Sequence, residues 1–217
     1  MFVVEALAVG LIFFLSMAIH EYAHGWVADR LGDATARRAG RLTLNPLKHV
    51  DPFGTIILPL FFVILILLRQ VNFIVGFAKP VPVNPFNLRH PRRDMMWIGL
   101  AGPAVNLVLA VIFSKLILLP FCSAAVAEWL LVVVFINLLF AVFNMIPVPP
   151  LDGSRLVTAL LPAKYAARYA GLEKYSFLMI ILIFIALRQL DLFHVAILPA
   201  VERCGNWLGV TFQGILF

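Results

Sequence analysis

Two histidines and a glutamate lie close together near the end of the first apolar stretch of the chain. The run His20-Glu21-Tyr22-Ala23-His24 has the pattern H-E-x-x-H. Helical residues four apart share one face, so two such imidazoles can bind a single metal ion. In this pattern the glutamate takes a proton from a metal-bound water, and zinc lowers the pKa of that water from about 16 to near 7. The spacing therefore predicts zinc-assisted hydrolysis, with His20 and His24 as ligands and Glu21 as the base.

The surroundings of this motif strengthen the prediction. His20, Glu21 and His24 belong to an otherwise apolar stretch at membrane depth, where ionisable groups are costly unless they are paired or ligated. The alternative is a polar cluster that reaches from a helix end toward water. That alternative accounts poorly for one histidine and worse for all three groups together.

A third ligand is expected elsewhere, because a catalytic zinc usually has three protein ligands and one open position. Asp152 follows the third long apolar stretch, within the proline-rich run 144–153. Prolines end a helix, Gly153 permits a sharp turn, and irregular backbone at membrane depth persists only where it is buried or lines a wet cavity. Capping of the following helix is the alternative role for Asp152, since Asp-Gly is a common turn. The residues alone leave both roles open.

Three motifs together resemble the site-2 protease family of intramembrane metalloproteases. They are H-E-x-x-H in the first helix, Gly102-Pro103-Ala-Val-Asn106 in a middle helix, and the run 144–153 that ends in Leu-Asp-Gly. The resemblance extends from the first helix to about Pro162, and the chain resembles the compact branch of the family that lacks a PDZ domain. The separation of Asn144 from Pro147 departs from the family's Asn-Pro-x-Pro-x-x-Asp-Gly pattern, so no role is assigned to Asn144.

This resemblance implies a zinc site and a reaction. It implies that His20, His24 and Asp152 bind one zinc ion per chain and that Glu21 is the catalytic residue. It also favours Asn106 as a catalytic hydrogen-bond donor to the oxyanion of a tetrahedral intermediate, where one such bond can be worth about 3 kcal/mol. The alternative for a lone asparagine in a membrane helix is a hydrogen bond between helices. The implied activity is hydrolysis of peptide bonds in membrane-spanning substrates, as in regulated intramembrane proteolysis.

The composition indicates a membrane protein. Of the 217 residues, 63% are hydrophobic, and the mean hydropathy is +1.00, which is more apolar surface than a soluble domain of this length can bury. A helix crosses a bilayer with about 20 apolar residues. The sequence offers four such stretches, at 2–27, 95–121, 127–146 and 175–198. We therefore expect an all-α multi-pass membrane protein with one domain at 1–217, made of a core at 1–162 and a C-terminal helix and tail at 163–217.

The charged residues indicate an orientation and argue against nucleic acid as a partner. The formal net charge is +6, but only 13% of residues are charged and no tract is rich in Lys and Arg. Basic residues collect on the cytoplasmic side of membrane proteins. The N-terminal flank holds only Glu5, whereas five basic residues follow the first helix: Arg30, Arg37, Arg38, Arg41 and Lys48. This pattern predicts that the N-terminus lies outside the cell membrane and that the active site lies near its cytoplasmic side.

A shorter apolar stretch at 52–68 contains Pro59 and has basic loops on both sides. A full crossing there would place one of those loops outside and would separate His24 from Asp152 across the membrane, so we expect a re-entrant segment. The segments 41–45 and 74–83 predict a small membrane-associated β element, which would bind unwound substrate by strand addition. An ordinary interfacial loop is the alternative for both segments.

Two other functions share some of these features. A metal or ion transporter also carries His and Asp in the membrane, but it predicts inverted repeats and a site near the midplane. A non-catalytic scaffold with a structural zinc predicts a fourth ligand, and Cys122 and Cys204 are too isolated to form a thiolate site. The sequence favours an intramembrane zinc metalloprotease that acts on a transmembrane protein or peptide. No motif indicates a particular substrate or an oligomeric state.

Overall fold

The computed structural model describes residues 2–57, 60, 61, 63, 64 and 78–212, and all regular structure within them is helical. The three longest helices are α1 (Phe2–Arg30), α4 (Pro91–Ile117) and α5 (Ala124–Asn144). The shorter α-helices are α2 (Thr35–Arg38), α6 (Gly153–Leu160), α7 (Ala163–Ala170), α8 (Ser176–Gln189) and α9 (Leu198–Leu208). Single turns of 3-10 or π helix occur at Pro46–His49, Pro52–Ile57, Pro85–Asn87, Gly171–Tyr175 and Phe193–Ile197.

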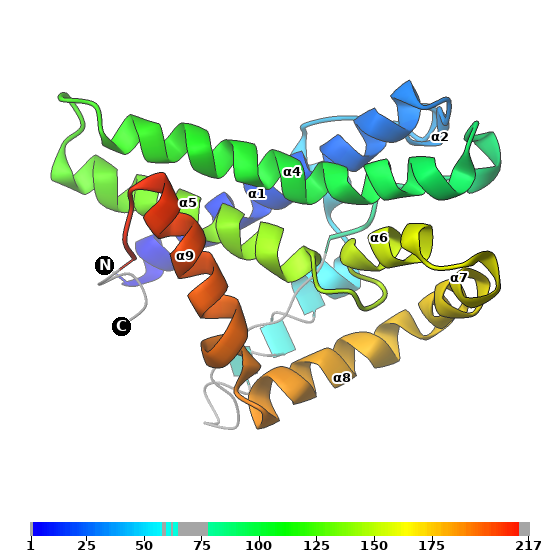
Figure 1. Cartoon of the computed structure of the whole chain (residues 1–217). Coiled ribbons are helices and arrows are strands. Elements are labelled where there is room, and N and C mark those ends of the chain that lie inside the picture. Colours follow the sequence, from blue (N-terminus) through cyan, green and yellow to red (C-terminus); the bar gives the residue numbers. More distant parts are fainter. Residues whose placement is uncertain (1, 58–59, 62, 65–77, 213–217) are drawn as a thin grey trace.

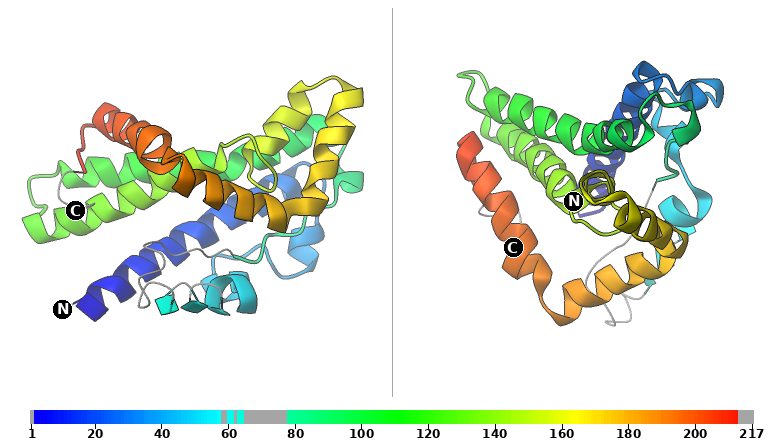
Figure 2. Two further views of the ribbon diagram at one scale, coloured as in Figure 1. Left: turned by 90° about the horizontal axis from the view of Figure 1, so that it is seen from below. Right: turned by 45° about the vertical axis from the view of Figure 1, so that its right-hand side comes forward.

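The central helix of the bundle is α4, which packs against α1 on one side and α5 on the other (Figure 1). Figure 2 shows that α1 is close to α4 at the end that carries α2 and diverges from it toward the N-terminus. Between α4 and α5 the interior is apolar, with Ala110, Val134 and Leu138 fully buried. Val201 of α9 joins the same core, so the C-terminal end of the chain packs onto α5 rather than standing alone.

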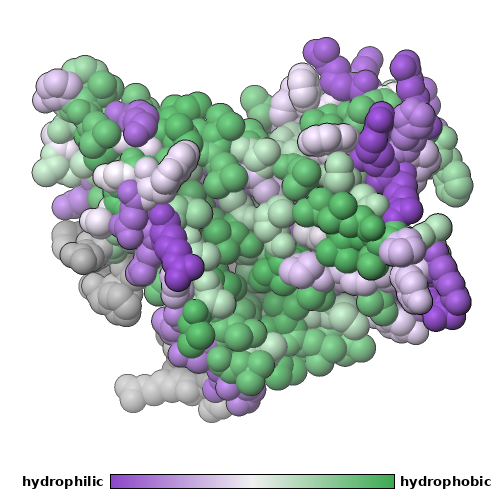
Figure 3. Space-filling model, viewed as in Figure 1, coloured by the Kyte–Doolittle hydropathy of each residue, from purple (hydrophilic) through white to green (hydrophobic). Residues whose placement is uncertain are grey.

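In contrast, α8 stands away from the bundle (Figure 2). None of its residues is buried, although its sequence is strongly apolar. Figure 3 shows hydrophobic residues across the middle of the molecule, with hydrophilic residues gathered mainly over the end that carries α2 and α7. Leu187 packs against the core and Phe184 lies beside Phe143 of α5, so α8 touches the bundle along one side, and the rest of its apolar surface is stable against lipid rather than water.

The expected multi-pass membrane architecture is confirmed at the level of its helices. Within the described part of the chain, four helical segments are long and apolar enough to cross a membrane: Leu7–Arg30, Pro91–Ile117, Ala124–Asn144 and Ala163–Gln189. The first three agree with the stretches predicted at 2–27, 95–121 and 127–146.

The fourth stretch, predicted at 175–198, is displaced. It ends at Gln189, because Asp191 adopts a left-handed backbone conformation with φ of 48° and breaks the helix. The Asp191 carboxylate then accepts a hydrogen bond from His194 at 2.6 Å, and the chain turns into α9. The mean hydropathy stays high on both sides of Asp191, so hydropathy alone does not locate the end of this helix.

Two finer predictions are not confirmed. Residues 52–57 of the expected re-entrant segment form a π-helical turn, but 58–59, 62 and 65–68 lie outside the described residues. The expected β element is not a strand at 41–45 or at 78–83, and 74–77 lie outside the described residues. Residues 78–83 have no regular secondary structure: Pro80 and Pro82 lack the N–H groups that a strand ladder requires, and residues before prolines favour extended conformations.

A buried carboxylate holds together the two ends of the long connection between α1 and α4. Asp33, just after α1, accepts hydrogen bonds from the Asn84 backbone N–H and the Asn87 side chain, both at 2.7 Å. Burial opposes ionisation of this carboxyl, but hydrogen bonds from Thr35, Asn87 and Asn84 outweigh it and hold the pKa of Asp33 below its usual range. The chain therefore leaves α1 and enters α4 at the same end of the bundle.

Candidate metal centre

His20 and His24 lie one turn apart on the face of α1 that contacts α4, and both side chains are buried. Their Nε2 atoms are 3.0 Å apart. Each ring is fixed through its other nitrogen: Nδ1 of His24 hydrogen bonds to the Ile98 carbonyl oxygen, and Nδ1 of His20 to Oδ1 of Asn106, each at 2.6 Å. Both rings therefore direct Nε2 toward the same point.

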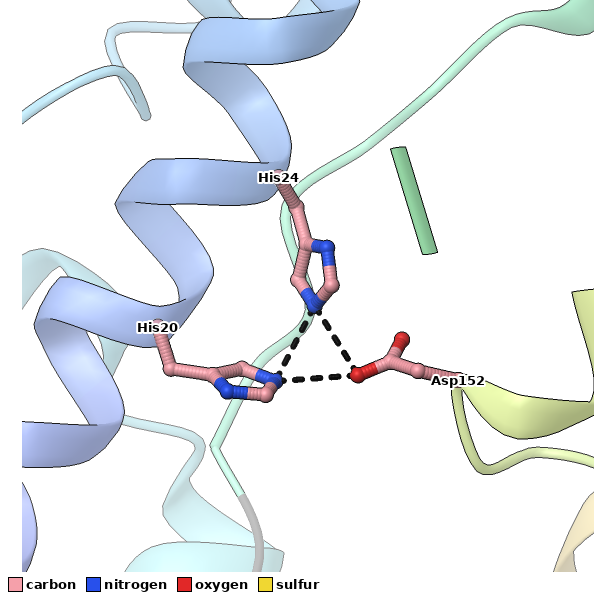
Figure 4. A group of neighbouring side chains, drawn as sticks. All are labelled: His20, His24 and Asp152. Atoms are coloured by element: carbon pink, nitrogen blue, oxygen red, sulfur yellow. Dashed lines mark hydrogen bonds and ion pairs between the residues drawn. The ribbon is translucent and has the colours of Figure 1, made fainter. Parts of the chain in front are cut away.

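Asp152 completes the cluster from the turn between α5 and α6. Its Oδ2 lies 3.1 Å from Nε2 of His20 and 3.1 Å from Nε2 of His24 (Figure 4). Asp152 occupies the cap position of α6, but its side chain makes no capping hydrogen bond. Of the two roles that the sequence left open, the orientation of the carboxylate agrees with the ligand role.

The close approach of the turn to α5 depends on Gly153. A Cβ atom at this position would collide with the backbone of Met145 and lie 2.7 Å from the carbonyl oxygen of Ile146. The turn can therefore fold back on the end of α5 only with glycine at this position, and this folding places the preceding Asp152 beside α1.

The three atoms fit a zinc ion. Ligands about 2.0–2.1 Å from a tetrahedral zinc ion lie roughly 3.3 Å apart, close to the 3.0–3.1 Å separations seen here. Two imidazole nitrogens and one carboxylate oxygen form a donor set typical of catalytic zinc. Among the residues that the structure describes, no fourth His, Cys, Asp or Glu joins this group. The donor set thus leaves a coordination position for water or substrate.

Glu21 lies beside the cluster and is hydrogen bonded to a segment far away in sequence. Its Oε2 accepts a hydrogen bond of 2.9 Å from the backbone N–H of Val81. Residues 78–84, which we call the proline segment, run past α1 here. A Cβ atom on Gly25 would lie 3.0 Å from the Val81 side chain, so the segment packs tightly against the helix turn that carries Glu21.

The proline segment is fixed at both ends. The Lys79 N–H donates to the His49 carbonyl oxygen at 3.0 Å, and the Arg41 guanidinium donates to the Lys79 carbonyl oxygen at 2.6 Å. The Asn84 N–H is held by Asp33. Val81 therefore presents its N–H to Glu21 from an anchored backbone.

Asn106 contacts the cluster through His20. Its Nδ2 donates to Oδ1 of Asn137 at 2.8 Å, so both polar atoms of the Asn106 side chain are hydrogen bonded. Sequence reasoning missed the contacts of Asn137, Val81 and Ile98. Asn137 alone carried a signal, as an amide within the very apolar stretch 127–146.

The fold and the cluster define a class: membrane-embedded metalloproteases with an H-E-x-x-H helix and an acidic third residue. The family model described as Peptidase family M50 matches residues 8–122 and 120–187, and the chain belongs to this family, as the resemblance to site-2 proteases predicted. The chain is accordingly a zinc metalloprotease of the site-2 type, with zinc as its cofactor.

Curated relatives agree with this assignment. The chain is 37% identical over 180 residues to the Bacillus subtilis protein named "Putative zinc metalloprotease YwhC", covering 79% of this chain and 77% of the relative. It is 31% identical over 173 residues to "Putative zinc metalloprotease Rip2" of Mycolicibacterium smegmatis, covering 79% of this chain and 64% of the relative. Against "Zinc metalloprotease MJ0392" of Methanocaldococcus jannaschii the identity is 24% over 157 residues, covering 71% of this chain and 34% of the relative. No solved structure matches the chain significantly.

The two imidazoles occupy the space that a side chain at position 102 would fill, so this position requires glycine. A Cβ atom here would lie 2.5 Å from Nε2 of both His20 and His24. We expect Gly102→Ala to reduce the zinc content of detergent-purified protein to less than about a tenth of the wild-type value, because both ligand atoms must move. Gly10→Ala is the matched control, since nothing lies within 4 Å of that position. Equal zinc in Gly102→Ala and wild type would show that the ion binds elsewhere.

Proposed function

We propose that this chain is an intramembrane endopeptidase that hydrolyses peptide bonds of membrane-spanning substrates, as in regulated intramembrane proteolysis. The observation that carries the proposal is the convergence of His20, His24 and Asp152 beside Glu21, within helices apolar enough to cross a membrane. Hydrolysis at such depth requires water to reach the cluster, and the position left by three ligands accommodates it.

In this proposal His20, His24 and Asp152 hold one zinc ion per chain. When bound, the ion supplies a Lewis acid that polarises the scissile carbonyl and lowers the pKa of water. Glu21 accepts the proton of the attacking water and donates it to the leaving amine. The Val81 N–H fixes the direction of the Glu21 carboxylate through Oε2, and we assign proton transfer to Oε1.

The family resemblance favoured an oxyanion role for Asn106, in which Nδ2 would donate to the intermediate. The hydrogen bonds of Asn106 to His20 and Asn137 support a different role. We propose that Asn106 orients His20, and that it would have to break its bond to Asn137 before it could reach an oxyanion.

We further propose that the metal centre lies near the cytoplasmic side and that the N-terminus lies outside. The basic residues after α1 support this orientation. The hydrogen bonds of Asp33 to Asn84 and Asn87 support a return of the intervening chain to the side on which it began. A re-entrant segment at 52–68 satisfies that condition, whereas a single crossing does not.

Replacement of Glu21 and Asp152 separates chemistry from metal binding. We expect Glu21→Gln to keep about one zinc per chain. Its rate of cleavage of a transmembrane model substrate in liposomes should fall about 100- to 10,000-fold. We expect Asp152→Ala to lose zinc and cleavage together. A transporter or a scaffold with a structural zinc would retain its function in Glu21→Gln, and cleavage by that variant at the wild-type rate would contradict the proposal.

Val81→Pro tests the orientation of Glu21. Val81 already lies between two prolines, and the residue before a proline is confined to extended conformations that proline itself adopts. The substitution therefore removes the N–H with little change of backbone. We expect cleavage to fall about tenfold or more at unchanged zinc content, as for the loss of one hydrogen bond to a charged group. Val81→Ala keeps the N–H and therefore separates this effect from loss of the side chain. Equal activity of the two variants would exclude a role of the Val81 N–H in orienting Glu21.

Cysteine labelling tests the orientation. In a background without Cys122 and Cys204, we expect Arg89→Cys to react with a membrane-impermeant reagent only after the cells are permeabilised and the reagent reaches the cytoplasmic face. Phe121→Cys, at the exposed turn between α4 and α5, is the matched control and should react in intact cells. Labelling of Arg89→Cys in intact cells would contradict both the orientation and the re-entrant segment.

A further inference from the structure

A chain of buried polar side chains runs through the apolar interior from α5 to the metal centre. Ser16, Asn137 and Asn106 are 4%, 0% and 0% exposed, and they lead to His20. Asn137 Nδ2 donates to Ser16 Oγ at 3.1 Å, and Asn137 Oδ1 accepts from Asn106 Nδ2 at 2.8 Å. An amide without hydrogen-bond partners is costly in such an interior, so each of these side chains depends on the partners that the others provide.

The direction of every hydrogen bond in this series of buried side chains follows from one backbone carbonyl. The oxygen of Val133 can only accept, and Asn137 Nδ2 donates to it at 2.8 Å. With its donor end held by Val133 and Ser16, Asn137 turns its acceptor end to Asn106. Asn106 must answer with its own donor end, which leaves Oδ1 facing His20.

The consequence at the metal centre is a single tautomer. Oδ1 of Asn106 can only accept, so Nδ1 of His20 carries the proton and Nε2 keeps its lone pair for the metal. His24 reaches the same state directly, because its Nδ1 faces the carbonyl oxygen of Ile98. His24 is thus oriented directly by a backbone carbonyl. His20 is oriented by the Val133 carbonyl through the amides of Asn137 and Asn106.

We propose that Asn137 and Ser16 are positioning residues for the zinc ligand His20, acting through the amide orientation of Asn106. The proposal rests on the metal site under the proposed function. It differs from a simple helix-to-helix hydrogen bond, which would stabilise the bundle without selecting a tautomer. Loss of the groups that orient a histidine ligand typically lowers metal affinity about 10- to 100-fold.

Asn137→Leu is the first variant. It removes the amide that fixes Asn106, so the Asn106 side chain is free to turn its NH₂ group toward His20, which opposes the tautomer that binds metal. We expect the zinc affinity, measured by competition with a chelator in detergent, to fall about 10- to 100-fold. Because the buried Asn106 amide loses its Asn137 partner, the midpoint of thermal unfolding of the metal-free protein should fall as well, so a second background is needed to separate the two effects. Ser16→Ala should cost less, because Val133 still holds Asn137.

Asn106→Asp supplies the decisive comparison. Both oxygens of a carboxylate accept, so Asp at this position can receive the His20 proton in either orientation and no longer depends on Asn137. Asn137→Leu should therefore lower zinc affinity in the wild-type background but not in the Asn106→Asp background. A role in packing alone would lower it equally in both.

A buried hydroxyl outside this network of hydrogen bonds provides the control. Ser114→Ala removes another fully buried hydroxyl, one that donates only to the Val111 carbonyl of its own helix, and should leave zinc affinity unchanged. Wild-type affinity in Asn137→Leu, or an equal loss in both backgrounds, would overturn the proposal while leaving the metal site intact. A wild-type protein that binds no zinc would overturn the metal site itself and this proposal with it.

Discussion

The structure depends on one constraint: a polar group inside an apolar bundle must find its partner within the protein. Three ligand side chains meet between α1, α4 and the turn after α5, and both imidazoles are hydrogen bonded to a further group. Ile98 and Asn106 hold the two imidazoles, and Gly102 leaves the space that the rings occupy. The helices therefore pack closely at the end where the cluster lies and diverge toward the N-terminus of α1.

Much of the site could be predicted because its key residues follow local rules. The spacing of His20 and His24 on one helix face is enough to pair them. Long apolar stretches are enough to locate α1, α4 and α5, and the family resemblance of the proline-rich run is enough to select Asp152 among several acidic residues. The residues around Asp152 could not decide between ligand and cap, because that choice depends on where the carboxylate points relative to α1.

The remaining features depend on contacts between distant segments, which periodicity does not encode. The hydrogen bond from Val81 to Glu21 joins residues 60 positions apart, and that between Asn106 and Asn137 joins residues 31 apart. The end of the fourth apolar stretch was misplaced because one residue, Asp191, changes the backbone direction within apolar surroundings. The small β element was expected from residue types that favour strands, and at 78–83 the prolines at 80 and 82 each remove a donor that a ladder would use.

The proline segment also has two unlike edges. Successive residues of an extended chain direct their N–H groups to opposite sides, so Lys79 and Val81, two residues apart, share one edge and direct their N–H groups to His49 and Glu21. Pro80 and Pro82 occupy the positions between and after them, so the opposite edge offers carbonyl oxygens and no donor. A peptide extended along that edge gains only half the bonds of a full ladder. For the same reason an identical segment of a second chain cannot complete a ladder along that edge, which is how prolines protect exposed edges from aggregation.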